Sequence, residues 1–180
     1  MSPRAGQAVG PFATEETYLR RADDRRSEQR RGVLTFLAGA ETYGVEILSI
    51  REIIKLREIT EVPRAPRFLL GIITVRGLVM PVIDLRRRLR LDSAPMGRLA
   101  RILVVLHRGE RFGVVVDEVR DVVRFADSQI EPPPPSLAPS EAPFLAGIGR
   151  HQQGEHERLV ILLSLDAVLS FEVSDRGANR

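Results

Sequence analysis

The sequence predicts an all-β protein made of two small barrels related by internal duplication. Short runs rich in Val and Ile alternate with turn-forming residues, which is typical of short strands joined by tight connections. The block Tyr43-Gly44-Val45 returns 69 positions later as Phe112-Gly113-Val114, and the apolar pattern is kept on both sides of it. About five short strands in each half of roughly 60 residues suit a small closed barrel.

Two further blocks repeat in the same order. Phe68 to Ile72 matches Phe144 to Ile148 at an offset of 76, and Met80 to Leu89 matches Val160 to Leu169 at an offset of 80. Because the offset grows along the chain, we expect the extra residues in loops. A barrel of roughly 60 residues buries too little surface to be secure alone, so we expect the two barrels to pack together and leave a cleft for a ligand or partner.

The folded part is expected between two polar ends. Residues 1–31 are rich in arginine, with acids interspersed and no apolar stripe, and predict a disordered or loosely helical tail; a basic arm for an acidic partner is the alternative. We expect one folded unit over residues 32–171, with a first barrel at about 32–92 and a second at about 98–171. Residues 172–180 are expected to form a frayed tail.

The apolar stretch from Phe68 to Leu85 predicts a β-hairpin. Two buried strands are expected on either side of a tight turn at Gly77, because glycine adopts the backbone angles that such turns need. Pro81 has no N–H to donate, so its strand is expected at a sheet edge or at a bulge. Arg76, at the turn, has to reach solvent or pair with a carboxylate.

Three other segments have a predicted structure. Residues 50–56 are predicted as a strand, because they are β-branched and too short for a secure amphipathic helix. The proline-rich residues 132–143 predict a stiff connecting loop. The sequence DAVL near the C-terminus predicts a short helix capped by Asp166.

The composition and motifs argue against most kinds of reactive site. The chain has no cysteine, so it has neither disulfides nor thiolate nucleophiles. No apolar run approaches the roughly 20 residues of a transmembrane helix. His151 and His156 do not have the i, i+4 spacing of a helical metal pair, and phosphate-binding glycine motifs are absent. We therefore predict no cofactor, no metal ion and no enzymatic activity.

Two charged clusters allow alternative functions. Asp117, Glu118 and Asp121 could supply a catalytic acid and base, but their counterparts in the first half do not repeat the cluster, and a solvent-exposed face with ion pairs is the simpler interpretation. The run Arg86–Arg90 could bind nucleic acid, which predicts binding that falls steeply with salt. No aromatic residues accompany this run, which favours a solvated helix face and no nucleic-acid partner.

Four motifs in this order resemble the CheW-like domain family, whose members are adaptors that couple chemoreceptors to a histidine kinase. The motifs are YGVEILSIREI at 43–53, VRGLVMPVIDL at 75–85, RFGVVVDEVRDV at 111–122 and LVILLSLDAVL at 159–169. The resemblance covers about residues 33–170. It implies two SH3-like five-stranded barrels packed about a pseudo-twofold axis, with a short C-terminal helix.

The resemblance also implies a receptor-binding groove. In the family an arginine pairs with a glutamate on an earlier strand, and these residues correspond to Arg76 and Glu52; we expect the pair to be partly buried rather than fully exposed. The implied apolar lining corresponds to Ile50, Ile53, Gly71, Ile102, Val119 and Val122. Arg101 stands where the family often has an apolar residue, so the edge of the groove departs from the pattern there.

The function that the resemblance implies is assembly without chemistry. The cytoplasmic tip of a chemoreceptor would lay apolar residues of its helical hairpin into the groove. The first barrel would dock on the regulatory domain of a CheA-type histidine kinase. The protein would be cytoplasmic and would reach the membrane only through the receptor arrays; flagellar, pilus-driven and other outputs stay open.

Overall fold

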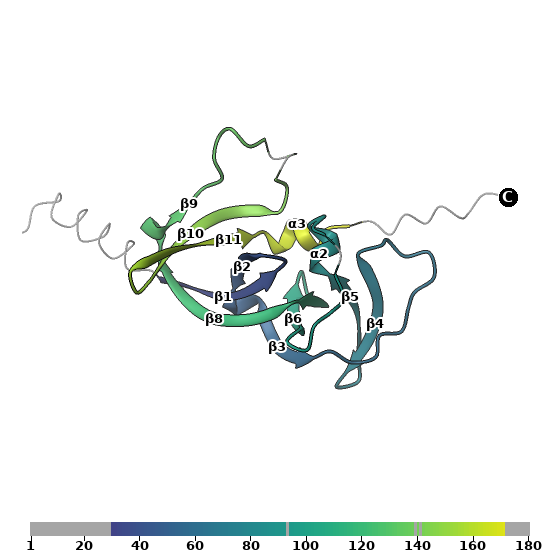
Figure 1. The fold of residues 1–180 in the computed structure, drawn as a ribbon. Coiled ribbons are helices and arrows are strands. Elements are labelled where there is room, and N and C mark those ends of the chain that lie inside the picture. The colour runs from purple at the N-terminus through teal and green to yellow at the C-terminus, as the bar shows by residue number, and fades with distance from the viewer. Residues whose placement is uncertain (1–29, 93, 139, 141, 172–180) are drawn as a thin grey trace, which may run out of the picture.

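Residues 30–171 fold into two β-sheets with two short α-helices at their junction (Figure 1). The computed structural model describes residues 30–171 except 93, 139 and 141. The first sheet has the order β8-β1-β2-β11-β10-β9, and the second has the order β3-β6-β7-β5-β4. In chain order the elements are β1 (Arg30–Ala38), β2 (Glu41–Glu46), η1 (Ile47–Ser49), β3 (Ile50–Lys55), β4 (Leu69–Val75), β5 (Leu78–Asp84), α2 (Leu85–Arg88), β6 (Arg101–His107), β7 (Glu110–Val116), β8 (Glu118–Ala126), η2 (Asp127–Gln129), β9 (Ile130–Glu131), β10 (Leu145–Gln153), β11 (His156–Leu163) and α3 (Leu165–Leu169).

The predicted duplication is confirmed, and the two halves exchange strands. The sequence repeat makes β1 and β2 equivalent to β6 and β7, and it makes β3, β4 and β5 equivalent to β8, β10 and β11. Equivalent strands follow one another in the same order in both sheets. The chain crosses between the sheets twice, after β2 and after β7. The second sheet is therefore one continuous piece of chain, while β1 and β2 complete the first sheet. The sheets do not coincide with the predicted division at 32–92 and 98–171.

Two equivalent glycines allow the parallel strand pairs to approach closely. β11 pairs in parallel with β2 at Gly44, and β5 pairs in parallel with β7 at Gly113. A Cβ atom at Gly44 would lie 2.9 Å from Val160 Cγ1 on β11, and a Cβ atom at Gly113 would lie 3.2 Å from Val82 Cγ2 on β5. Any larger residue at either position would push the paired strands apart.

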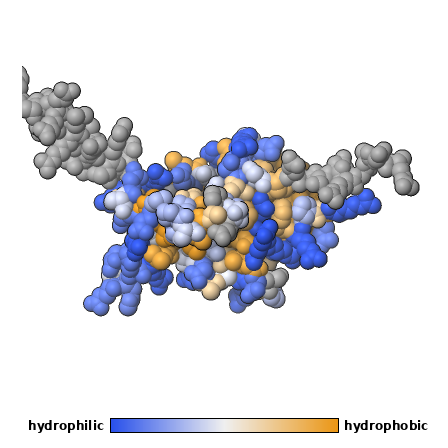
Figure 2. Space-filling view, turned by 90° about the horizontal axis from the view of Figure 1, so that it is seen from above, coloured by the Kyte–Doolittle hydropathy of each residue, from blue (hydrophilic) through white to orange (hydrophobic). Residues whose placement is uncertain are grey.

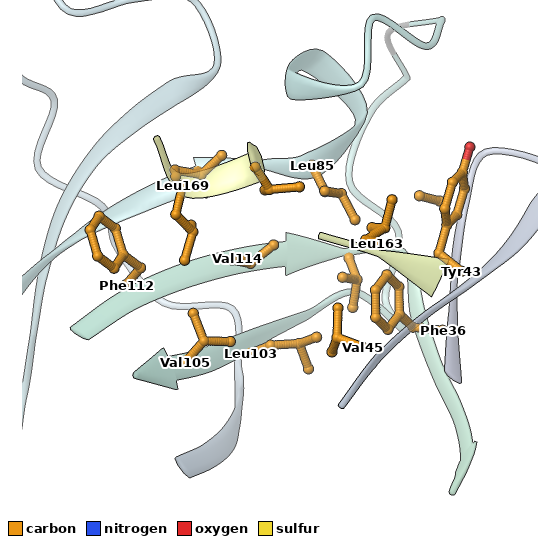
Figure 3. Close-up of a cluster of buried hydrophobic side chains, with 14 of the residues drawn as sticks. Phe36, Tyr43, Val45, Leu85, Leu103, Val105, Phe112, Val114, Leu163 and Leu169 are labelled. Atoms are coloured by element: carbon orange, nitrogen blue, oxygen red, sulfur yellow. The ribbon is translucent and has the colours of Figure 1, made fainter. Parts of the chain in front are cut away.

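Three clusters of buried apolar side chains stabilise this arrangement. The largest, which we call the shared core, takes side chains from both sheets and both short helices (Figure 3). Its members include Phe36, Val45, Leu103, Val114 and Val168. Each barrel also has an interior cluster of its own: Val33, Val123, Phe125 and Val160 in the first sheet, and Ile73, Val75, Met80, Val82, Ile102, Val104 and Val115 in the second. The shared core packs the two halves together, and a hollow lined by residues of both halves, among them Arg88 and Phe144, remains beside it.

Arg88 of α2 joins the two halves by hydrogen bonds to the end of α3. Its Nε donates to the carbonyl oxygen of Val168 at 2.7 Å, and its Nη2 donates to those of Ala167 and Ser170 at 2.9 Å each. The last carbonyl groups of a helix have no partner within the helix and carry partial negative charge, so a guanidinium both satisfies and neutralises them. A side chain from the end of the first half thus holds the end of the second.

The same guanidinium lies over three aromatic rings. Its Cζ is 4.7 Å from the ring centroid of Phe68, 4.9 Å from that of Phe144 and 5.9 Å from that of Phe171. Phe68 and Phe144 are equivalent in the sequence repeat, so one arginine interacts with matching positions of both halves. Burial and, to a lesser degree, the charge of Arg90 lower the pKa of the Arg88 guanidinium.

The helices α2 and α3 begin at equivalent capping residues. The side chains of Asp84 and Ser164 each accept a hydrogen bond from a backbone N–H in the first turn of the helix that follows. The prediction that Asp166 caps α3 is wrong, because Asp166 lies within the first turn and pairs instead with Arg108 at 2.7 Å. Serine at the position before the helix supplies the cap.

The structure also bears on the predictions for the strand at residues 50–56, for the start of the fold and for Pro81. The strand over residues 50–56 is confirmed by β3, and Arg30 and Arg31 belong to β1 rather than to a tail. The expectation that Pro81 lies at a sheet edge or at a bulge is wrong, because β5 lies between β7 and β4 and Pro81 pairs in register with Ile72. The proline fits because the pairing of β5 with β7 begins only at Val82. The predictions for the two terminal tails concern residues 1–29 and 172–180, outside the described part of the chain.

We expect Arg88→Met to lower the free energy of unfolding by about 3 kcal/mol, because it removes charge-assisted hydrogen bonds and leaves partly buried carbonyl groups without a partner. Methionine keeps the apolar stem over the rings, so the loss reports the guanidinium. Urea unfolding followed by circular dichroism measures it. The control Arg111→Met, at an exposed position of β7, should change stability by less than about 0.5 kcal/mol. Equal stabilities of the two variants would contradict this role of Arg88.

Candidate functional site

Arg76 lies at the tip of the β4–β5 hairpin. Val75 pairs with Leu78, so Arg76 and Gly77 form a two-residue turn, and both have positive φ angles of 51° and 79°. This geometry belongs to the turns that match the twist of a hairpin, and the second position favours glycine. The turn explains why an arginine next to a glycine separates two apolar strands.

The predicted partner of Arg76 is present. Its Nη2 lies 3.1 Å from Oε1 of Glu52 on β3. The side chain of Arg76 is 76% exposed and that of Glu52 is 32% exposed, so the expectation of a partly buried pair is wrong. A solvated ion pair adds only about 0–1 kcal/mol to stability, which leaves the guanidinium available to a partner.

Ile50 and Ile53 lie on β3, the edge strand of the second sheet. Ile50 packs partly buried against the shared core, while Ile53 is 41% exposed. A register shift against β6 between Ile50 and Glu52 places an extra residue in β3. Such bulges bend an edge strand and re-aim its side chains, and they also discourage unwanted pairing along the free edge.

Val119 and Val122 occupy the equivalent positions on β8, the edge strand of the first sheet. Val119 packs against the shared core, as Ile50 does, and Val122 is 53% exposed. β8 carries a matching bulge, where the hydroxyl of Thr35 donates to the Asp121 carbonyl at 2.8 Å and accepts from the Asp121 N–H at 3.1 Å. The view in Figure 1 shows both edge strands along the lower side of the molecule.

Four of the predicted lining residues thus lie on the two edge strands. Ile50, Ile53, Val119 and Val122, together with the Arg76–Glu52 pair, are here called the docking surface. It comprises two exposed apolar side chains and two that pack against the shared core. Apolar side chains are exposed on other faces too, as the view from above shows (Figure 2). The docking surface is distinguished by its repetition on two equivalent bulged strands.

Gly71 and Ile102 lie beneath the surface instead. Ile102 is fully buried in the interior of the second barrel. Gly71 has a φ of 148°, and a Cβ atom there would overlap the carbonyl oxygen of Thr60. Thr60 forms a β-bridge with Ile72 through two backbone hydrogen bonds. The equivalent Gly147 packs against the carbonyl of Glu131 in the same way. Both predicted residues therefore shape the barrel and do not line the docking surface.

Sequence reasoning missed two exposed residues of the hairpin. Leu78 is 46% exposed and Val79 is 65% exposed, although the run was expected to be buried throughout. A continuous apolar run carries no alternation, so it does not reveal which positions face solvent. Leu78 and Val79 follow directly after the turn, where a hairpin projects from its sheet, and this place in the sequence could have indicated that they are exposed.

Most of the arginines that the structure describes in the run Arg86–Arg90 pair with carboxylates or carbonyl groups of the fold. In the Arg86–Arg90 run, Arg86 pairs with Asp117 at 2.7 Å and Arg87 pairs with Asp84 at 3.2 Å, in addition to the role of Arg88. This run is therefore structural rather than a free helix face. Among the side chains that the structure describes, no three His, Asp or Glu residues converge as metal ligands would.

The helices described between residues 30 and 171 are all too short to cross a membrane. The fold and the docking surface define a class of protein: a two-barrel β scaffold that acts by binding. The CheW-like domain family matches residues 32–173, and the chain belongs to this family. It is a non-enzymatic adaptor of chemotaxis signalling, of the kind that couples receptors to CheA.

Similar proteins span most of the chain. The chemotaxis protein CheW of Helicobacter pylori is 33% identical over 134 residues, which cover 74% of this chain and 78% of that protein. The CheW of Bacillus subtilis is 30% identical over 142 residues, which cover 79% of this chain and 88% of that protein. The crystal structure of the scaffolding protein TtCheW from Thermoanaerobacter tengcongensis superimposes with a TM-score of 0.71 at 30% identity, over 79% of this chain and 94% of that one.

We expect Gly71→Ala to destabilise the protein by at least about 2 kcal/mol, because the added methyl group overlaps the Thr60 carbonyl at a backbone angle that suits glycine. Thermal unfolding measures the loss. The control Gly97→Ala, where a Cβ atom would meet nothing within 4 Å, should leave the melting temperature nearly unchanged. If Gly71→Ala is as stable as the wild type but binds receptors poorly, the residue lines the binding site after all.

Proposed function

We propose that the docking surface binds the cytoplasmic tip of a chemoreceptor. The observation that carries this proposal is the matched pair of edge strands, each of which exposes one apolar side chain beside another that rests on the shared core. A helical hairpin that lays apolar residues across Ile53 and Val122 would cover both. A rigid base is favourable for such binding, because little conformational entropy is lost there when the complex forms.

Arg76 is proposed to contact the receptor at the border of the docking surface. Glu52 holds the guanidinium at 3.1 Å and so limits its conformations before binding, while most of the side chain stays exposed. Charged groups at the rim of an apolar contact contribute mainly to specificity and to the rate of association. The ion pair is then a positioning device for recognition more than a source of stability.

A CheA-type histidine kinase is proposed as the second partner, bound through its regulatory domain. An adaptor that couples two proteins needs a second surface, and the exposed Leu78 and Val79 on the β4–β5 hairpin offer one in the first half of the chain. The protein would then be cytoplasmic and would join membrane receptor arrays through the receptors alone.

We expect Ile53→Asp to weaken binding of a chemoreceptor cytoplasmic fragment about tenfold or more, because it places a charge in the centre of an apolar contact. Surface plasmon resonance with a receptor fragment from the same organism measures the affinity. Leu159→Asp, an equally drastic change at a 52% exposed leucine on β11, is the matched control and should bind normally. Normal binding by Ile53→Asp would reject the docking surface.

We expect Arg76→Ala to weaken receptor binding while the free energy of unfolding changes by less than about 1 kcal/mol, since the ion pair is exposed. Glu52→Gln should weaken binding as well, because it releases the guanidinium from its position. Parallel binding and urea-unfolding measurements separate the two effects. A large loss of stability in Arg76→Ala, with no change in affinity, would show that the residue is structural.

A further inference from the structure

We propose that the receptor segment bound by this chain carries carboxylates beside its apolar contact residues, and that a basic hollow at the end of β3 receives them. This inference rests on the proposed function and adds a chemical requirement on the partner. The hollow has a volume of about 750 Å³ and is lined by Lys55, Leu56, Arg98, Leu99 and Arg101, together with the backbone of the turn before β6.

The positive charge of this hollow is not neutralised within the described part of the chain. Lys55 and Arg101 are direct neighbours across the β3–β6 ladder, where like charges destabilise a sheet. Arg101 donates from Nη1 to the carbonyl oxygens of Arg98 and Ala100 at 3.2 and 2.8 Å, which fixes its position without cancelling its charge. No acidic residue lines the hollow.

Several arginines elsewhere on the described surface are neutralised by a carboxylate, although others are not. Arg31, Arg76, Arg86 and Arg150 each pair with a carboxylate at 3.1 Å or less. Among the residues that the structure describes, Lys55, Arg98 and Arg101 have no such partner within 4.0 Å. A concave site that holds three cations costs stability by mutual repulsion, and a partner with negative charge would relieve it.

The hollow continues the docking surface along β3. Arg51, Ile53 and Lys55 alternate with partly buried residues and face outward, so Lys55 lies two residues beyond Ile53 on the same side. Two residues of a strand advance by about 6.7 Å, and four residues of a helix advance by about 6 Å. A helix that runs along β3 with an apolar residue on Ile53 therefore brings the residue one turn further on to Lys55.

The lining favours a carboxylate-bearing helix over a nucleic acid. Leu56 is partly buried and Leu99 is 56% exposed, so apolar contacts flank the cations. Single-stranded nucleic acids are bound through stacking on aromatic side chains, and no aromatic residue lines the hollow. An acidic, amphipathic helix matches both the charge and the apolar rim.

The test compares receptor binding at several salt concentrations. The double variant Lys55→Gln/Arg98→Gln should bind the receptor cytoplasmic fragment about five- to tenfold more weakly than the wild type at low salt. The difference should shrink at high salt, where charges are screened. Arg111→Gln, five register positions away at the far end of the β6–β7 ladder, is the matched control and should bind as the wild type does.

A second arm asks which carboxylate is bound. Each Asp or Glu of the receptor tip is changed to Lys in turn, and the binding of each changed receptor fragment to Lys55→Glu and to the wild type is measured. At one position the new Lys should restore binding to Lys55→Glu and weaken binding to the wild type. No restoration at any position would overturn the proposal. So would binding of the double variant that equals the wild type at every salt concentration, or a short DNA duplex that binds the wild type and not the double variant.

The outcome is separable from the proposed function. The uncharged variant Ile53→Asn removes the apolar contact without adding a charge beside Lys55, so its effect on affinity tests the docking surface alone. If Ile53→Asn loses binding and the double variant does not, the docking surface stands and the acidic requirement fails. If Ile53→Asn binds normally, both fail.

Discussion

The guanidinium of Arg88 is the interaction on which the arrangement of the two halves depends. It sits between Phe68 and Phe144, two residues that the duplication makes equivalent, and it closes the end of the last helix through three carbonyl groups. Its own counterpart in the second half is Val168, a buried apolar residue of the shared core. A perfect repeat would place two cations here or none, so the asymmetry lets one charged group serve both halves without repulsion.

The docking surface follows from that arrangement. The shared core fixes β3 and β8 at the free edges of two different sheets, and the equivalent bulges on these strands expose Ile53 and Val122. Because Ile50 and Val119 are anchored on the shared core, the surface has a firm base. Affinity at such a surface depends on a few apolar anchors, while the charges around them select the partner.

Much of this could be predicted from the sequence, and the failures have physical causes. The repeated blocks predicted equivalent strands because each apolar pattern specifies a buried face. The resemblance to the CheW-like domain family implied that Arg76 pairs with Glu52, and the structure contains this pair. The exchange of strands was missed, because strand patterns show which faces are buried but not which strands pair. The exposure of Arg76 and the burial of Ile102 were missed for a related reason: in a continuous apolar run every position looks alike. Lys55 and Arg101 face each other only through the β3–β6 register, which the sequence leaves open.

The exchange of strands between the halves bears on how the chain can be cut or shortened. β1 and β2 complete a sheet whose other strands come after residue 117, and β6 and β7 form the centre of a sheet that begins with β3. A fragment that contains one half would hold unfinished pieces of two sheets, and it would need a separate copy of the other fragment to close either. In the intact chain the connection from α2 to β6 links the two halves covalently, so each half meets the other at an effective concentration of about 1 mM or more. Folding of the intact chain therefore does not depend on the protein concentration.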